Sequence, residues 1–203
     1  IHRGLNGVYF DRSGTSDIDG KAGELRYRGY SIHDLATQST FEESVYLLMQ
    51  GELPTRAQLD AFTAELKAAR RLPPEIYEVI RTVRKAHPMD VLRTAVSALA
   101  AFDPETADKS PEATLRKGIR LTSQVPMIVA AHDHIRNGRA PIAPDPRLGH
   151  AANFLYMLTG TAPSADTARL MDTDMILHAE HGSNASTFTA RVVASTQADL
   201  FAA

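Results

Sequence analysis

The stretch TFEESVYLLMQGELPTRAQLDAFTAELKAA, residues 40–69, carries the start and stop signals of two consecutive helices. Thr40 with Glu43, and Thr55 with Gln58, have the spacing of a capping box, in which two side chains satisfy exposed backbone N–H groups at a helix start. Gly51 supplies a stop between them. After Thr55, apolar side chains recur at helical spacing, at Leu59, Phe62, Leu66 and Ala69. We therefore predict two helices, the second of them amphipathic.

Similar signals continue through the chain beyond residue 30. Pro73-Pro74, His87-Pro88 and Ser110-Pro111 each place a proline where a helix can begin. The last of these helices is expected to reach Asn137-Gly138, and two more are expected after Gly149 and Ser164. Because no alternating strand pattern follows residue 30, the predicted fold is all-α, a layered bundle of roughly nine helices.

Residues 1–30 differ from the rest of the chain. They are rich in glycine and hold short β-prone pieces at Val8-Tyr9-Phe10 and Glu24-Leu25-Arg26-Tyr27. Such pieces between turn residues predict one or two small hairpins. We therefore divide the chain into an N-terminal hairpin segment, residues 1–30, and a helical part, residues 31–203.

The composition excludes several classes of protein. The 203 residues contain 22 Lys and Arg against 24 Asp and Glu, a formal net charge of -2, so no overall basic field attracts nucleic acid or anionic lipid. The absence of cysteine excludes disulfides, thiolate zinc sites and a cysteine nucleophile, and it fits a cytoplasmic protein. No apolar stretch is long enough to span a bilayer. We expect neither nucleic acid nor membrane as a partner.

The segment ILHAEHGSNASTFTARVV, residues 176–193, concentrates polar chemistry where one helix ends and another begins. His178 and His181 are three residues apart and could share a helix face, but a zinc site needs a third protein ligand, and we predict no metal. His181 and Asn184 are expected to project from the corner between the helices, where backbone N–H groups are also unpaired. Such a corner suits a small dicarboxylate. The competing interpretation is that His178 packs or hydrogen-bonds locally and that His181 only caps a helix end.

The sequence Arg70-Arg71-Leu72-Pro73 leaves two interpretations of Arg70 open. A cation at the C-terminal end of a helix stabilises the helix dipole, and many such arginines are solvated. The alternative, a substrate-binding arginine at this corner, comes only from a resemblance to a protein family whose motifs follow.

The sequence LHAEHGSNASTFTARVVAST, residues 177–196, resembles the segment of the citrate synthase family that ends in His-x-x-Asn-Ala-Ser-Thr. Further pieces agree with the family in the same order: Gly4-Leu5-x-Gly7-Val8, Leu25-x-Tyr27-x-Gly29-Tyr30, Phe41-Glu42-Glu43, Leu47-Leu48-x-x-Gly51-x-Leu53-Pro54, His87-Pro88-Met89 and Ala151-Ala152-Asn153-Phe154-Leu155-Tyr156. The resemblance covers nearly the whole chain. It implies a mostly helical fold with a large and a small domain, and a homodimer of packed helices.

The resemblance also implies an activity. Members of the family condense acetyl-CoA with oxaloacetate and water to citrate and CoA, at the entry to the tricarboxylic acid cycle, with acetyl-CoA as co-substrate and no cofactor. By motif position, His181 resembles the histidine that binds oxaloacetate. Asn184 is expected as a second donor and Arg70 as a third substrate contact. The family's catalytic histidines and aspartate come later in the chain, so we expect none within residues 1–203, which resemble an N-terminal half that stops before the catalytic half and the small domain.

Two alternatives of function stay open at this stage. One is 2-methylcitrate synthase, which accepts propionyl-CoA. The other is a non-catalytic helical module that binds a partner chain or a ligand without turning it over. For the 203 residues alone, we expect no activity.

Overall fold

The computed structural model describes residue 7 and residues 12–203, and over this part the chain is mostly helical. Three short strands come first, β1 (Ser16–Asp19), β2 (Glu24–Tyr27) and β3 (Tyr30–Ser31). Nine helices follow in the described residues: α1 (Ile32–Gln38), α2 (Phe41–Gln50), α3 (Arg56–Ala68), α4 (Pro74–Val83), α5 (Pro88–Leu99), α6 (Pro111–Arg136), α7 (His150–Thr159), α8 (Ala165–His178) and α9 (Ala185–Ser195). This confirms the all-α prediction with a small N-terminal sheet.

The helix starts form as their side chains predict. Thr40 and Thr55 each accept a hydrogen bond from the backbone N–H three residues later, and Glu43 and Gln58 complete both capping boxes. Gly51 ends α2 in the left-handed conformation at φ +96°. The helix predicted from Ser110-Pro111 is α6, which continues through Pro126.

The N-terminal sheet is antiparallel in the order β1-β2-β3. Ser16 pairs with Tyr27, and Asp19 with Glu24, across the first hairpin. The third strand extends the sheet to Ser31, one residue beyond the predicted boundary, because Arg28 (φ +50°) and Gly29 (φ +90°) turn the chain tightly back onto β2. The β-prone piece predicted at residues 8–10 lies outside the described residues.

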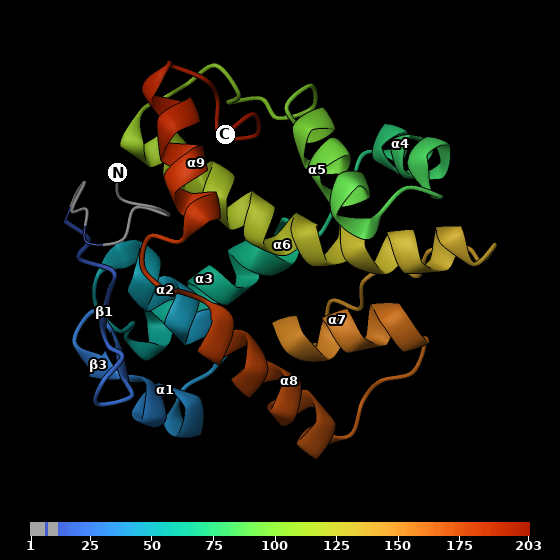
Figure 1. The fold of residues 1–203 in the computed structure, drawn as a ribbon. Helices are drawn as coiled ribbons and strands as arrows, with labels where there is room; N and C mark the ends of the chain where they lie inside the picture. The colour runs from blue at the N-terminus through green and yellow to red at the C-terminus, as the bar shows by residue number, and fades with distance from the viewer. Residues whose placement is uncertain (1–6, 8–11) are drawn as a thin grey trace.

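Helix α6 organises the packing of the helical part. It runs through the middle of the molecule, with α4 and α5 against one side and α7 against the other, and α8 packs on α7 (Figure 1). The largest apolar core lies among α4, α5, α6 and α7 and includes Ile76, Val91 and Ile128. A smaller core joins the sheet to the helices through Tyr27, Ile32, Leu35, Leu47 and Ile176. Among the residues described, no helix combines the length and apolar character needed to cross a membrane.

Candidate functional site

The corner between α8 and α9 presents His181 and Asn184 to solvent. Helix α8 ends at His178, and α9 begins after Asn184. The Oδ1 atom of Asn184 accepts a hydrogen bond from the N–H of Thr187 at 2.9 Å, so Asn184 is the N-cap of α9. Both His181 and Asn184 are exposed, as the sequence predicts for two residues that project from a corner.

The side chain of His178 hydrogen-bonds locally, but it does not pack. Its Nδ1 atom lies 2.8 Å from the carbonyl oxygen of Asp174, one turn earlier on α8. The side chain is 76% exposed, because this face of α8 points to solvent. The expected local hydrogen bond is therefore confirmed, and the alternative of packing is wrong.

Contacts of Tyr27, in β2, and of Glu180, in the corner, tie the corner to the sheet. The hydroxyl of Tyr27 accepts a hydrogen bond from the N–H of Glu180 at 3.2 Å and lies 2.9 Å from the carbonyl oxygen of Ile176. The Oε1 atom of Glu180 accepts from the N–H of Gly182 at 2.7 Å and from the hydroxyl of Ser16 at 3.1 Å. Burial raises the pKa of Tyr27, so its hydroxyl keeps its proton at neutral pH.

Arg70 turns into the protein instead of into solvent. Only 5% of the residue is exposed, so the interpretation of Arg70 as a solvated cation at a helix end is wrong. Its Nη1 atom donates to the carbonyl oxygen of Leu148 at 2.9 Å. Its Nε and Nη2 atoms are buried and have no partner within the described part of the chain. Burial lowers the pKa of the guanidinium, and the charge of Glu42 opposes that effect.

Glu42 and His150 accompany Arg70 in the interior. The Oε1 atom of Glu42 accepts a hydrogen bond from the backbone N–H of His150 at 2.7 Å, which places a carboxylate at the N-terminal end of α7. A negative charge there is stabilised by the helix dipole. The imidazole of His150 packs on the ring of Phe41, with centroids 4.8 Å apart. Burial first, and then the charge of Arg70, lower the pKa of His150 from 6.5 to about 4.

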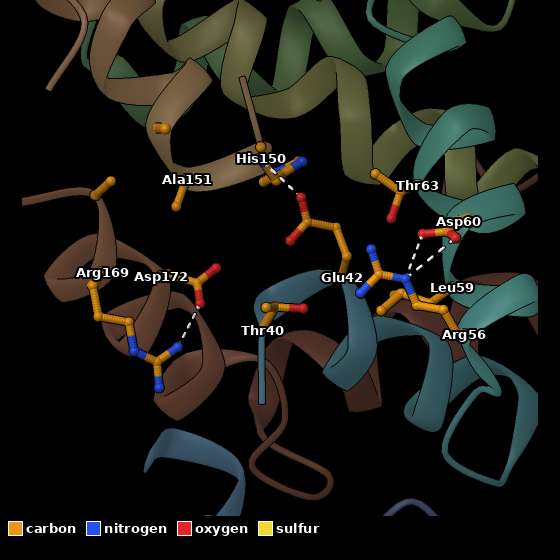
Figure 2. Close-up of a pocket in the computed structure, with 13 residues that line it drawn as sticks. Thr40, Glu42, Arg56, Leu59, Asp60, Thr63, His150, Ala151, Arg169 and Asp172 are labelled. Atoms are coloured by element: carbon orange, nitrogen blue, oxygen red, sulfur yellow. Dashed lines mark hydrogen bonds and ion pairs between the residues drawn. The ribbon is translucent and has the colours of Figure 1, made fainter. Parts of the chain in front are cut away.

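A cleft of about 450 Å³ opens beside this group, between α3 and α8 (Figure 2). Glu42 reaches from α2 toward the start of α7, and Arg56 pairs with Asp60 on one side. On the other side, Arg169 of α8 pairs with Asp172 at 2.9 Å. Each cation is thus matched by a neighbouring carboxylate, and the cleft has no excess of positive charge that would select an anion.

Asp172 and Arg169 also fasten α8 to the first two helices. Asp172 accepts from the N–H of Phe41 at 3.1 Å, and Arg169 donates to the carbonyl oxygen of Ser39 at 2.7 Å. Burial raises the pKa of Asp172, and the hydrogen bond from Phe41 opposes this rise without cancelling it. These contacts hold α8 at a point away from the corner that follows this helix.

The structure thus places His181 and Asn184 at the same corner and Arg70 in a different group. The polar neighbours of Arg70 are Leu148, Glu42 and His150. At the corner, Glu180 contacts β1 and β2, and Asn184 contacts Thr187 of α9. Across residue 7 and residues 12–203, no three His, Asp or Glu side chains are grouped so that they could hold a metal ion.

Comparison with known proteins agrees with this fold. Residues 4–203 match the family model described as the citrate synthase C-terminal domain. The chain belongs to the citrate synthase family. It is 46% identical to a citrate synthase of Haloferax volcanii, a match that covers 100% of this chain and 55% of that protein. It is 43% identical to a 2-methylcitrate synthase of Mycobacterium tuberculosis, over 100% of this chain and 51% of that protein.

Solved structures of citrate synthases have the same fold. The citrate synthase of Pyrobaculum aerophilum superimposes with a TM-score of 0.95 at 42% identity, over 100% of this chain and 53% of that one. The citrate synthase of Thermotoga maritima gives a TM-score of 0.86 at 35% identity, over 99% of this chain and 52% of that one. The chain therefore spans about half the length of the citrate synthase family members that it matches.

Sequence reasoning missed Tyr27, Glu180, Glu42 and His150. Tyr27, Glu42 and Glu180 lie within the motifs that resemble the citrate synthase family, which was the one available signal for them. Their partners lie far away along the chain, 153 residues for Tyr27 and Glu180 and 108 for Glu42 and His150. No local spacing rule connects residues at such separations.

Proposed function

We propose that the protein containing this chain is a citrate synthase, which condenses acetyl-CoA with oxaloacetate and water to citrate and CoA. Membership of the citrate synthase family over residues 4–203 is the observation that carries this proposal. The relatives named citrate synthase from Haloferax volcanii and Deinococcus radiodurans are 46% and 45% identical. The reaction would supply the tricarboxylic acid cycle with citrate. The lack of cysteine is in keeping with the reducing cytoplasm, where we place the protein.

The proposed oxaloacetate contacts are His181, Asn184 and Arg70. An exposed imidazole and an exposed amide stand at the start of α9, where unpaired backbone N–H groups and the helix dipole favour an anion. Oxaloacetate is a dicarboxylate, so it matches this polarity. Arg70 lies in a different group from the corner, and its role as a third contact is proposed from the family resemblance; its Nε and Nη2 donors have no protein partner among the described residues.

We propose that the groups that perform the chemical steps lie outside residues 1–203. In this arrangement, residues 1–30 form the N-terminal hairpin segment, and residues 31–203 form the helical part of the large domain. The chain then supplies the oxaloacetate-binding surface, and the acyl-CoA co-substrate meets it from the remaining half. We also propose a homodimer, since large apolar side chains such as Leu170 and Met89 are exposed.

A second candidate function is 2-methylcitrate synthase. The 43% identity to the Mycobacterium tuberculosis 2-methylcitrate synthase is close to the 46% identity to the Haloferax volcanii citrate synthase, so identity alone favours neither acyl donor strongly. The third candidate, a non-catalytic binding or dimerisation module, applies to residues 1–203 when they are isolated.

Release of the CoA thiol distinguishes these functions. Because residues 1–203 contain no cysteine, they add no background to a thiol assay. A catalytically complete protein that contains the chain should release CoA from acetyl-CoA and oxaloacetate faster than from propionyl-CoA, and the reverse order would assign it as a 2-methylcitrate synthase. Residues 1–203 alone should release none, and clear turnover by the homogeneous chain would refute the placement of the catalytic groups elsewhere.

A further inference from the structure

Tyr27 performs the role of a cap at the C-terminal end of α8. The last carbonyl groups of a helix have no partner within it. The Tyr27 hydroxyl lies 2.9 Å from the carbonyl oxygen of Ile176 and 3.1 Å from that of Glu180, and it accepts from the N–H of Glu180 at 3.2 Å. The whole residue is 0% exposed. Its single hydroxyl therefore fixes the last turn of α8 and the residue directly before His181.

Glu180 fixes the residue directly after His181. Its Oε1 atom accepts from the N–H of Gly182 at 2.7 Å, which closes a small ring of chain around His181. The same oxygen accepts from the hydroxyl of Ser16 at 3.1 Å and from that of Thr15 at 3.4 Å. A carboxylate oxygen with several donors is held firmly, because each bond to a charged acceptor is stronger than a bond between neutral groups.

The backbone at Gly182 makes the turn possible. Gly182 has a φ of +70°, a conformation that side chains with a Cβ rarely adopt. A Cβ at this position would contact the Cδ1 atom of Ile18 at 3.7 Å and the Oγ atom of Ser16 at 3.9 Å. The turn after His181 therefore runs directly over β1.

We propose that Tyr27 and Glu180 are positioning residues for His181, so that the β1-β2 hairpin is part of the oxaloacetate site. This inference rests on the proposed function of His181. Backbone groups on both sides of His181 are held by contacts that reach the sheet, whereas the imidazole itself stays exposed. The hairpin thus fixes the backbone position of His181. Only the side-chain torsions of His181 remain free to orient the imidazole toward the substrate.

The variants Glu180→Gln and Tyr27→Phe test the proposal in a catalytically complete protein that contains residues 1–203. A misplacement of about 1 Å in an active site can lower a rate by up to about 100-fold. Because His181 is proposed to bind oxaloacetate, we expect a misplaced imidazole to raise the KM for oxaloacetate about tenfold. The KM for the acyl-CoA should stay the same, whereas a general loss of folded protein would lower the maximal rate and leave both KM values unchanged. The matched controls are Glu24→Gln and Tyr30→Phe, since both residues are exposed and lie in the same sheet.

A double-mutant cycle with His181→Ala tests whether Glu180 acts on oxaloacetate binding through His181. If Glu180 acts through His181, then Glu180→Gln should leave the oxaloacetate dependence of the His181→Ala protein unchanged. An equal rise in KM in both backgrounds would overturn the proposal. If Tyr27→Phe prevents folding, Glu180→Gln carries the test alone, because its side chain is only half-buried.

The single variant His181→Ala separates the proposed function of His181 from the positioning role of Tyr27 and Glu180. No change in oxaloacetate dependence on this substitution would refute the proposed function of His181, and the positioning role with it. A clear change with His181→Ala, together with unchanged values for Glu180→Gln and Tyr27→Phe, would refute the positioning role alone.

Discussion

Acidification from pH 7 to pH 4 should destabilise the chain through one buried side chain, His150. This imidazole lies at the start of α7, 5% exposed, beside the guanidinium of Arg70. Its Nδ1 atom has no partner among the residues described, so nothing there compensates a proton on that nitrogen. Protonation would place a second positive charge in the interior next to Arg70.

The sign and size follow from the pKa. Burial and Arg70 lower the pKa of His150 from 6.5 in the unfolded chain to about 4 in the folded one. Between these values the unfolded state binds more protons, so the free energy of unfolding falls as the pH falls from 6.5 to 4. At about 1.4 kcal/mol for each pKa unit, the full loss is about 3 kcal/mol.

Urea denaturation of the protein and of His150→Gln, at steps between pH 8 and pH 4, measures this loss. The glutamine variant cannot titrate here, and carboxylates contribute equally to both proteins, so the difference between the two curves isolates His150. The free energy of unfolding of the protein minus that of His150→Gln should be constant above about pH 6.5 and lower by about 3 kcal/mol at pH 4. A matched control, His33→Gln at an exposed site, keeps His150 and should retain the loss. Parallel curves for the protein and His150→Gln would refute the reasoning.

Four further outcomes are expected. Replacing His181 by Ala should weaken oxaloacetate binding by roughly 1.5–3 kcal/mol, or about ten- to a hundredfold. Replacing the exposed His178 should affect saturation much less, and a larger effect at His178 would reverse the two assignments. Thr55→Ala removes a capping-box hydroxyl and should lower the free energy of unfolding by about 1 kcal/mol in chemical denaturation, and an unchanged midpoint would contradict it. With Leu170 72% and Met89 62% exposed, light scattering should detect a dimer or larger species, and a compact monomer at micromolar concentration would refute self-association.

The parts of the fold that depend on neighbouring residues could be predicted from the sequence. The capping boxes at Thr40 and Thr55 and the glycine stop at Gly51 act within one turn of a helix, and all three have the expected geometry. Strands β1 and β3 lie outside the two β-prone pieces predicted from the sequence. In β3, two residues are too few for an alternating pattern to be recognised.

The interior group around Arg70 could not be predicted in the same way. The position of Arg70 after a helix says nothing about which way its side chain turns, and the solvated alternative was a reasonable expectation from the dipole rule. Its burial depends on Leu148, which is 78 residues away. The exposure of His181 and Asn184, in contrast, follows from the helix break that Gly182 marks in the sequence.

The distance along the chain between the sheet and α8 affects how the protein is made. The Tyr27 hydroxyl and the Ile176 carbonyl are separated by 149 residues. At about 5–20 residues per second, a ribosome needs roughly 7–30 s to synthesise that interval. During this time Tyr27, Ile32 and Leu35 have emerged without Ile176, which completes their core. The nascent chain therefore carries an uncovered apolar surface throughout this interval, and a chaperone that recognises such segments would bind there.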